Sequence, residues 1–420
     1  MAILNILRGE VKPALGVTEP VSVALAAAKA YQTIGGKLKS IRILVDPSLF
    51  KNAFFCMIPG TDDFGLELAA VLGVMKGVPE AGMEVLKKVG KKDAGEARAL
   101  LRDVPVKVSI KSGHIGLHVR AEVTTSRGTG SVLIEKKHDH VTLVKKKGKI
   151  VYRAARKSEA GTGSDEFKNL TIADLVHFAG NVPSKEIRFV LDAAEMNSAL
   201  AREGLRARWG MGAGLQLHAL MRKGKLARDA VSRSQINVAA ATDARLGGAK
   251  LPAMSVAGSG THALTAVLPI VAMAKQLKIG KEKMTRAIAL SLLVTIYMKM
   301  FTGRLSAFCG CAVTAGSGAA AGIVMMLGGG EKEIGHAIIN MAADVTGIIC
   351  DGANFGCSLK TSTGAASALK AAFLALNGTV MKAGSGIVGR TVEETIRNMG
   401  DLSSKSMDAV NNGILDIMTK

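Results

Sequence analysis

The spacing of apolar residues changes partway along this chain, and that change limits the folds open to it. Between residues 104 and 152, apolar and polar residues alternate in five short runs separated by turn residues, which is typical of an antiparallel sheet. From residue 172 onward the apolar residues recur with a helical period. A polar, Gly/Ser-rich stretch over residues 155–165 separates the two patterns. We therefore predict an α+β fold, with a mixed α/β domain containing an antiparallel sheet over residues 1–160 and an all-helical domain over residues 161–420.

Turn and capping residues locate individual elements. Thr18 and Pro20 mark a helix start and Gly35 a stop, so a helix is predicted between them. Residues 39–45 alternate like a strand, and residues 65–75 form a helix of small residues. In the second half, helices are predicted over residues 172–179, 184–203, 225–241, 261–276, 281–300, 311–327, 331–345 and 361–376.

The core has to be built from small aliphatic residues. Only 4% of the 420 residues are aromatic, whereas 48 are glycine, so the helices are expected to pack closely. Charges at Arg8, Glu10 and Lys12 interrupt the N-terminus before an apolar run long enough for a signal peptide. The apolar stretch 287–298 is shorter than the roughly 20 residues that a membrane span needs. We expect a cytoplasmic protein without a membrane segment.

A formal net charge of +21 raises the question of nucleic-acid binding. The basic residues are densest over residues 87–111 and 136–157, where they alternate with apolar residues or lie in turns. Aromatic residues that could stack on bases do not interleave with them. A solvated, lysine-rich sheet face is therefore favoured over a nucleic-acid interface. A basic surface would also attract an anionic substrate.

Four of the five cysteines cluster in two segments. Cys309 and Cys311 flank a single glycine, and Cys350 and Cys357 end a Gly-containing loop, while Cys56 stands apart. Neither spacing fits the paired knuckles of a structural zinc site. A larger iron–sulfur cubane with three cysteine ligands and one open iron suits the spacing, but buried apolar cysteines among small residues would look the same. Spacing alone leaves both interpretations open.

At these residues the sequence resembles the L-cysteine desulfidase (UPF0597) family, which is related to the iron–sulfur L-serine dehydratases. The resemblance covers essentially the whole chain and rests on ordered segments: LGVTEP, MIPGTDDFGLELAAVLG, GVPEAGMEVL, MNSALAREGLRARWGMGAG, ATDARLGG, AGSGTHALTAVLPIVA, GRLSAFCGCAVTAGSGAAAGIV and ICDGANFGCSLKTSTGAASA. It implies a [4Fe–4S] cluster held by Cys311, Cys350 and Cys357, with Cys309 as the alternative to Cys311. It also implies α,β-elimination on a small amino acid without pyridoxal phosphate.

The substrate side departs from the family pattern. Val17 stands where the family usually has the cysteine of LGCTEP, Thr261-His262-Ala263 replace Asn-Gln-Gly, and Asp62-Asp63 stand where small residues are expected. His262 could replace a missing base because imidazole titrates near neutrality, and Glu19 is a second candidate for proton transfer. Thr18 and Ser259 are candidates for binding the substrate carboxylate, with Gly258-Ser259-Gly260 ahead of a helix N-terminus, and Thr61 and Thr261 are further candidates for substrate binding.

Purely structural roles are also open for these residues. His262 could only cap its helix, and Glu19 could be no more than a residue favoured at a helix start. His138 and His140 form a His-x-His pair that could bind metal on one strand face, but a solvated sheet is the favoured setting for them.

The predicted function is an iron–sulfur-dependent lyase that acts on L-cysteine or L-serine through an altered pocket. The resemblance to related enzymes implies a homodimer. One alternative is a non-catalytic relative that serves as a redox or ligand-binding protein, and Val17 is its best support. Another is a hydro-lyase for a different β-substituted acid.

Overall fold

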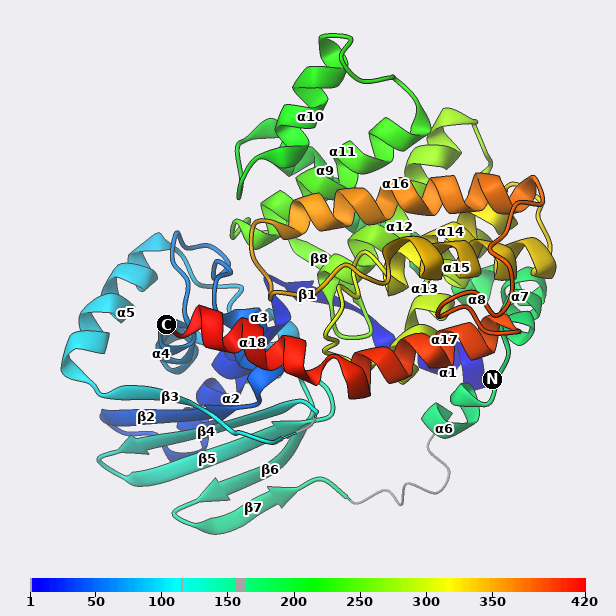
Figure 1. The fold of residues 1–420 in the computed structure, drawn as a ribbon. Helices are drawn as coiled ribbons and strands as arrows, with labels where there is room; N and C mark the ends of the chain where they lie inside the picture. The colour runs from blue at the N-terminus through cyan, green and yellow to red at the C-terminus, as the bar shows by residue number, and fades with distance from the viewer. Residues whose placement is uncertain (1, 115, 156–162) are drawn as a thin grey trace.

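The structure, a computed structural model, describes residues 2–114, 116–155 and 163–420. It has a sheet-containing half and a helical half that lie side by side (Figure 1). The elements of the first half are α1 (Ala2–Glu10), β1 (Val11–Leu15), α2 (Thr18–Ile34), β2 (Leu38–Val45), α3 (Pro47–Ala53), α4 (Leu66–Lys76), the 3₁₀ helix η1 (Pro79–Glu84), α5 (Lys91–Asp103), β3 (Val106–Ile110), β4 (His118–Thr125), β5 (Gly128–Glu135), β6 (Val141–Lys146) and β7 (Lys149–Arg153).

Helices dominate the second half. They are α6 (Gly163–Lys168), α7 (Ile172–Asn181), α8 (Ser184–Ile187), α9 (Val190–Arg206), α10 (Ala213–Arg222), α11 (Ala230–Leu246), α12 (Gly260–Gln276), α13 (Lys281–Thr302), α14 (Thr314–Met326), α15 (Glu331–Val345), α16 (Cys357–Leu376), α17 (Val392–Asp401), the π-helical η2 (Leu402–Ser406) and α18 (Asp408–Met418), with the short strand β8 (Pro252–Val256) between α11 and α12. The predicted α+β class is confirmed.

The five alternating runs form strands β3 to β7, as predicted. They do not form a simple meander, because β2 enters between β3 and β4 and the order is β3-β2-β4-β5-β6-β7. Strand β2 runs parallel to β3 and antiparallel to β4. One sheet face, with Ile41, Val119 and Ile134, is buried against α2 and α4. The other face exposes Arg42, Lys107 and Arg120, in keeping with the predicted solvated basic face.

Residues 2–15 pack with the second half rather than with the six-stranded sheet. Strand β1 pairs antiparallel with β8, with Val11 opposite Val256, and Leu7 of α1 belongs to the helical core. The second half is therefore not purely helical, because the apolar run before Gly258 pairs with a strand from the other end of the sequence. The predicted boundary at residues 160 and 161 lies outside the described residues, and the division into two domains stays a prediction.

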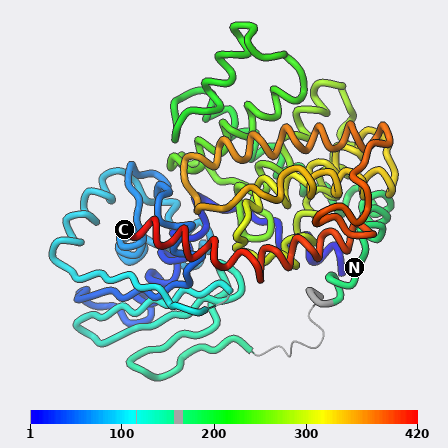
Figure 2. Tube along the Cα trace, viewed as in Figure 1, coloured from blue at the N-terminus to red at the C-terminus, as the bar shows by residue number. Residues whose placement is uncertain are grey.

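The C-terminal segment connects the halves. The C-terminal helix α18 runs back from the helical half and packs on α3 (Figure 2). In the described part of the chain one helix, α13, has the length and apolar composition to cross a membrane. In this fold, however, 78% of its most apolar window is buried, as in the core helix of a folded domain. Helices α12, α13 and α16 all pack against α14.

Candidate functional site

The two cysteine segments lie next to each other because the backbone ties them together. Phe308 and Ile349 form an antiparallel bridge. The Cys309 N–H donates to the Ile348 carbonyl over 2.7 Å, and the Cys350 N–H donates to the Ala307 carbonyl over 2.8 Å. Cys309 and Cys350, about forty positions apart in sequence, therefore lie on neighbouring backbone segments.

The other two thiols come from the starts of two helices. Cys311 lies in the turn ahead of α14, and Cys357 is the first residue of α16. The first-turn N–H groups of a helix have no intrahelical acceptor and favour negative charge nearby. Helices α14 and α16 therefore suit thiolates at these two positions.

The thiols influence one another electrostatically. The pKa of the Cys309 thiol is lowered to about 7, chiefly by a hydrogen bond with the Cys311 thiol. The same hydrogen bond, with burial, raises the pKa of Cys311 well above its usual range. Burial raises the pKa of Cys350, and it raises the pKa of Cys357 to about 12. A group that supplies positive charge at this point would stabilise all four thiolates.

Within the described residues, the thiols do not converge as the ligands of a single metal ion would. Among the residues that the structure describes, no three Cys, His, Asp or Glu side chains converge tightly enough to hold one metal ion. A cubane binds its thiolates through separate iron atoms, so its ligands lie farther apart than those of a mononuclear site. Among the described residues, Arg245 Nε, His262 Nδ1 and both ring nitrogens of His138 are buried without a hydrogen-bond partner, so a polar group bound here would satisfy them.

Buried cations surround the thiols. The exposed fractions are 2% for Lys51, 2% for Arg245 and 4% for Lys299. Over residues 2–114, 116–155 and 163–420, none of the three pairs with a carboxylate within 4.0 Å. Burial lowers the pKa of Lys299 to about 8, although the nearby Cys311 and Cys350 oppose that shift. Since an unpaired buried charge is costly, these residues favour an anionic occupant.

The start of α2 supplies the carboxylate of the site. Glu19 is buried, and its carboxylate accepts hydrogen bonds from the Thr18 hydroxyl over 2.9 Å and from the Asn52 amide over 3.1 Å. The Asn52 amide oxygen also faces the Cys350 thiol, at 3.8 Å. The Glu19 carboxylate is thereby held close to a predicted cluster ligand.

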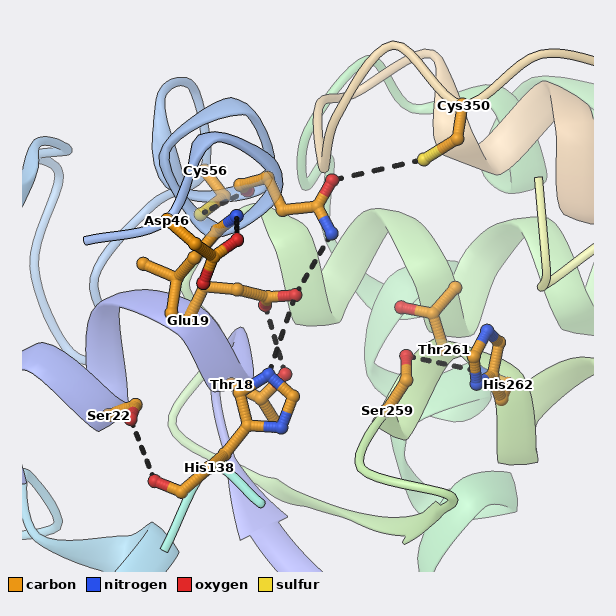
Figure 3. Close-up of polar contacts among 12 residues, drawn as sticks. Thr18, Glu19, Ser22, Asp46, Cys56, His138, Ser259, Thr261, His262 and Cys350 are labelled. Atoms are coloured by element: carbon orange, nitrogen blue, oxygen red, sulfur yellow. Dashed lines mark hydrogen bonds and ion pairs between the residues drawn. The ribbon is translucent and has the colours of Figure 1, made fainter. Parts of the chain in front are cut away.

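The start of α12 forms the facing wall. Figure 3 shows Ser259, Thr261 and His262 opposite Thr18, Glu19 and His138, with Cys350 nearby. Ser259 is the N-cap of α12, and its hydroxyl accepts from the His262 N–H at 3.4 Å. The Thr261 hydroxyl accepts a hydrogen bond from Arg245 over 2.7 Å, and the same guanidinium donates to the Gly16 carbonyl over 2.6 Å. Arg245 thus joins the start of α2 to the start of α12.

His262 does more than cap its helix. Its buried ring lies against Gly310, where a Cβ atom would approach Nε2 to 2.6 Å and Lys299 Nζ to 3.2 Å. Glycine is therefore needed at position 310, because a Cβ atom there would clash with the His262 ring. Burial, then the charge of Lys299, holds the pKa of His262 well below its usual range, so the ring is neutral near pH 7.

The favoured interpretation of His138 as a solvated sheet residue is wrong. His138 lies in the turn between β5 and β6 and is 4% exposed. Its Nε2 lies 3.8 Å from the Glu19 carboxylate, and its carbonyl accepts from the Ser22 hydroxyl over 2.7 Å. Gly258 packs on this ring, since a Cβ there would come within 2.9 Å of Nδ1. His140 is exposed, so the two histidines do not share one metal.

Thr61 uses its hydroxyl within its own turn. The hydroxyl donates to the Ile58 carbonyl over 2.9 Å and accepts from the Asp63 N–H over 3.1 Å. The two unusual acids beside it make surface ion pairs, Asp62 with Lys91 and Asp63 with Arg98. The role of Thr61 in substrate binding stays a prediction.

Val17 packs among apolar groups at the edge of the site. It is buried with Cys56 and Leu246, and Phe355 and Cys357 pack against this group. Burial, and then the charge of Glu19, raises the pKa of Cys56. The structure thus places the lone cysteine beside the position where the family usually has one.

Sequence reasoning missed Asn52, Arg245 and Lys299, and it misplaced His138. A signal was present for two of them. Arg245 lies in the quoted ATDARLGG segment, and Lys299 is a single lysine in an otherwise apolar stretch of α13. A lone charge in a buried helix marks a functional site or an ion pair.

The comparisons with known proteins identify the family of this chain. The family described as serine dehydratase alpha chain matches residues 80–416. A UPF0597 protein of Clostridium botulinum is 42% identical over 429 residues, covering 99% of this chain and 98% of the relative. One from Desulforapulum autotrophicum is 42% identical over 427 residues, covering 99% and 97%. One from Clostridioides difficile is 38% identical over 420 residues, covering 99% and 98%. The chain therefore belongs to the serine dehydratase alpha-chain family and is a UPF0597-type member of it.

Proposed function

We propose that this protein is an iron–sulfur-dependent lyase that catalyses α,β-elimination on a small amino acid, L-cysteine or L-serine. The observation that supports it most directly is the meeting of four thiols, one carboxylate and three buried cations in one place. Membership in the serine dehydratase alpha-chain family points to the same class of reaction. The overall conversion would be L-serine to pyruvate and ammonia, or L-cysteine and water to pyruvate, ammonia and hydrogen sulfide.

Cys311, Cys350 and Cys357 would hold a [4Fe–4S] cluster, with Cys309 as the alternative to Cys311. When bound, such a cluster supplies an iron with an open position, which acts as a Lewis acid toward the leaving group on the β-carbon. The helix starts at α14 and α16 would stabilise the thiolates.

Arg245 would bind the substrate carboxylate together with the start of α12. Its guanidinium is already fixed by Gly16 and Thr261, so its remaining donors are held in place before substrate arrives. The Ser259 hydroxyl and the free N–H groups of the first turn of α12 add donors at the same wall. These contacts orient the α-carbon toward the facing wall.

Glu19 would accept the α-proton. Its buried carboxylate accepts from the same Asn52 amide that faces the Cys350 thiol, and Thr18 and Asn52 fix its direction. His138 Nε2 lies 3.8 Å away and would exchange a proton with Glu19 after closing to hydrogen-bond distance. His262 stands on the opposite wall beside Gly310, and its neutral ring would relay a proton to the departing hydroxide or hydrosulfide rather than store one.

We place this reaction in the cytoplasm. All five cysteines are free thiols in the structure, which suits a reducing compartment.

Turnover tests this proposal. Anaerobically purified protein is incubated with L-serine, L-cysteine and a panel of other β-substituted amino acids, and pyruvate and ammonia are measured. We expect turnover of at least one substrate, loss of turnover in E19Q with the cluster absorbance retained, and no change in E67Q. Glu67 is a matched control because it is exposed and lies in the first turn of α4. Retained turnover in E19Q would remove Glu19 from the mechanism.

Val17 favours one second candidate, a non-catalytic relative that binds a ligand without turnover. The buried valine offers no thiol where the family usually has one. In the same experiment this candidate predicts ligand binding without release of ammonia from any member of the panel.

A further inference from the structure

Lys299 is a buried lysine on a helix that is otherwise apolar at this point. It lies near the end of α13 among Tyr297, Met298 and Thr302, which are all buried. Its ammonium group makes one hydrogen bond that the structure defines, to the Ser306 hydroxyl over 3.2 Å. Ser306 in turn donates to the Phe308 carbonyl over 2.9 Å, so this contact reaches the backbone immediately ahead of Cys309.

The ammonium group lies directly on the segment that joins Cys309 to Cys311. A Cβ atom at Gly310 would come within 3.2 Å of Lys299 Nζ. Of the charged groups that influence Lys299, the acidic ones are the thiols of Cys311, Cys350 and Cys309, and Arg304 is the basic one. Arg304 itself is paired with Glu10 through both carboxylate oxygens, at 2.8 and 2.9 Å.

We propose that Lys299 is a positioning residue that supplies the counter-charge for an anionic group bound at the Cys309-Gly310-Cys311 segment. The inference rests on the proposed function, because the anionic group is the cluster with its thiolates. A cubane core of charge 2+ with three thiolates carries a net negative charge, which a fixed cation nearby stabilises.

This role has a consequence that a structural role would not have. A buried cation without a carboxylate destabilises the metal-free fold, and replacing such a charge with an apolar side chain of similar volume is neutral or stabilising. The same replacement removes the counter-charge from the bound cluster. The substitution Lys299→Met should therefore raise the stability of the metal-free protein and weaken its hold on the cluster.

The experiment compares wild type, K299M, K299R and the control K275M, since Lys275 is an exposed lysine in the last turn of the neighbouring helix α12. Thermal midpoints are measured on metal-free protein. Iron per chain and the midpoint reduction potential are measured after anaerobic reconstitution. For K299M we expect a raised thermal midpoint, together with loss of iron or a more negative reduction potential. K299R and K275M should retain iron.

Each of these measurements can overturn the proposed role of Lys299. A K299M protein that is less stable without metal, or that matches wild type in iron content and potential, would overturn the role of Lys299. Loss of iron from K299R to the same extent would show that side-chain volume matters rather than charge, and would overturn it too. Wild type that takes up no iron would instead overturn the proposed function and this inference with it. Iron uptake without any turnover would overturn the lyase alone.

Discussion

The Asn52 side-chain amide donates to the Glu19 carboxylate over 3.1 Å. The oxygen of the same amide faces the Cys350 thiol at 3.8 Å. Asn52 lies on α3 of the sheet-containing half, and Cys350 belongs to the helical half. One side chain therefore sets the position of the proposed base relative to a proposed cluster ligand.

Replacing Asn52 by leucine should slow turnover without removing the cluster. A hydrogen bond to a charged group contributes about 1.5–3 kcal/mol, so kcat/KM should fall roughly 10- to 100-fold. The matched control is N412L, at an exposed asparagine of α18. An N52L enzyme with wild-type kcat/KM would show that Glu19 does not depend on this contact.

Arg245 should affect substrate binding more than the chemical step. R245K keeps a positive charge but cannot hold Gly16, Thr261 and a carboxylate together, because lysine lacks the planar fork. We expect KM to rise about 10-fold or more, with a smaller change in kcat. R222K, at an exposed arginine of α10, serves as the control. An unchanged KM in R245K would contradict the carboxylate role.

Gly310 should tolerate no side chain. A Cβ there would lie 2.6 Å from His262 Nε2, so G310A should displace His262 or the cysteine segment and lower the iron content after reconstitution. Gly95 in α5 has nothing within 4 Å of the same atom, so G95A should leave iron binding intact and add about 0.5–1 kcal/mol of stability. Equal iron content in G310A and wild type would contradict this packing.

Glu10 should make stability depend on pH in the acid range. Burial alone would raise the pKa of its carboxyl, but the charges of Arg304 and Lys137 outweigh burial and lower it below the model-compound value of 4.5. A lowered pKa contributes stability above pH 4.5, and this contribution is lost as the pH falls through the folded-state pKa.

The test for Glu10 is the thermal midpoint of wild type and E10Q from pH 7 to pH 3. Hydrogen bonds to a charged group contribute about 1.5–3 kcal/mol, and this pair is only partly buried, so E10Q should melt below wild type at pH 7. The two midpoints should converge toward pH 3. A gap that stays constant across this range would mean that the charge of Glu10 is not what stabilises the fold.

Local signals in the sequence were enough to predict most of the helices. Helix α2 begins at Thr18 and ends before Gly35, as its Pro and Gly residues predict. The predicted helix over residues 184–203 divides into α8 and α9. The pairing of β1 with β8 could not be predicted, because the partners are far apart in sequence and each strand is only five residues long. The same limit applies to the insertion of β2 between β3 and β4.

The candidate site was predictable where chemistry stands out in the sequence. The cysteine segments and the Thr18-Glu19 helix start are conspicuous, and the structure brings them together. His138 was misjudged because the lysine-rich sequence around it suggested a solvated sheet face, whereas tertiary packing against Glu19 and Gly258 buries it. Asn52 gave no signal, since its role depends on the approach of Cys350 from the other half.

The central claim is that this chain holds a four-iron cluster on its clustered thiols. The most direct measurement is iron and acid-labile sulfide per chain after anaerobic purification and reconstitution, with the visible spectrum of the same sample. We expect about four iron atoms and about four sulfide ions per chain, with the broad absorbance of a cubane. Protein that remains without iron and sulfide under these conditions would contradict it.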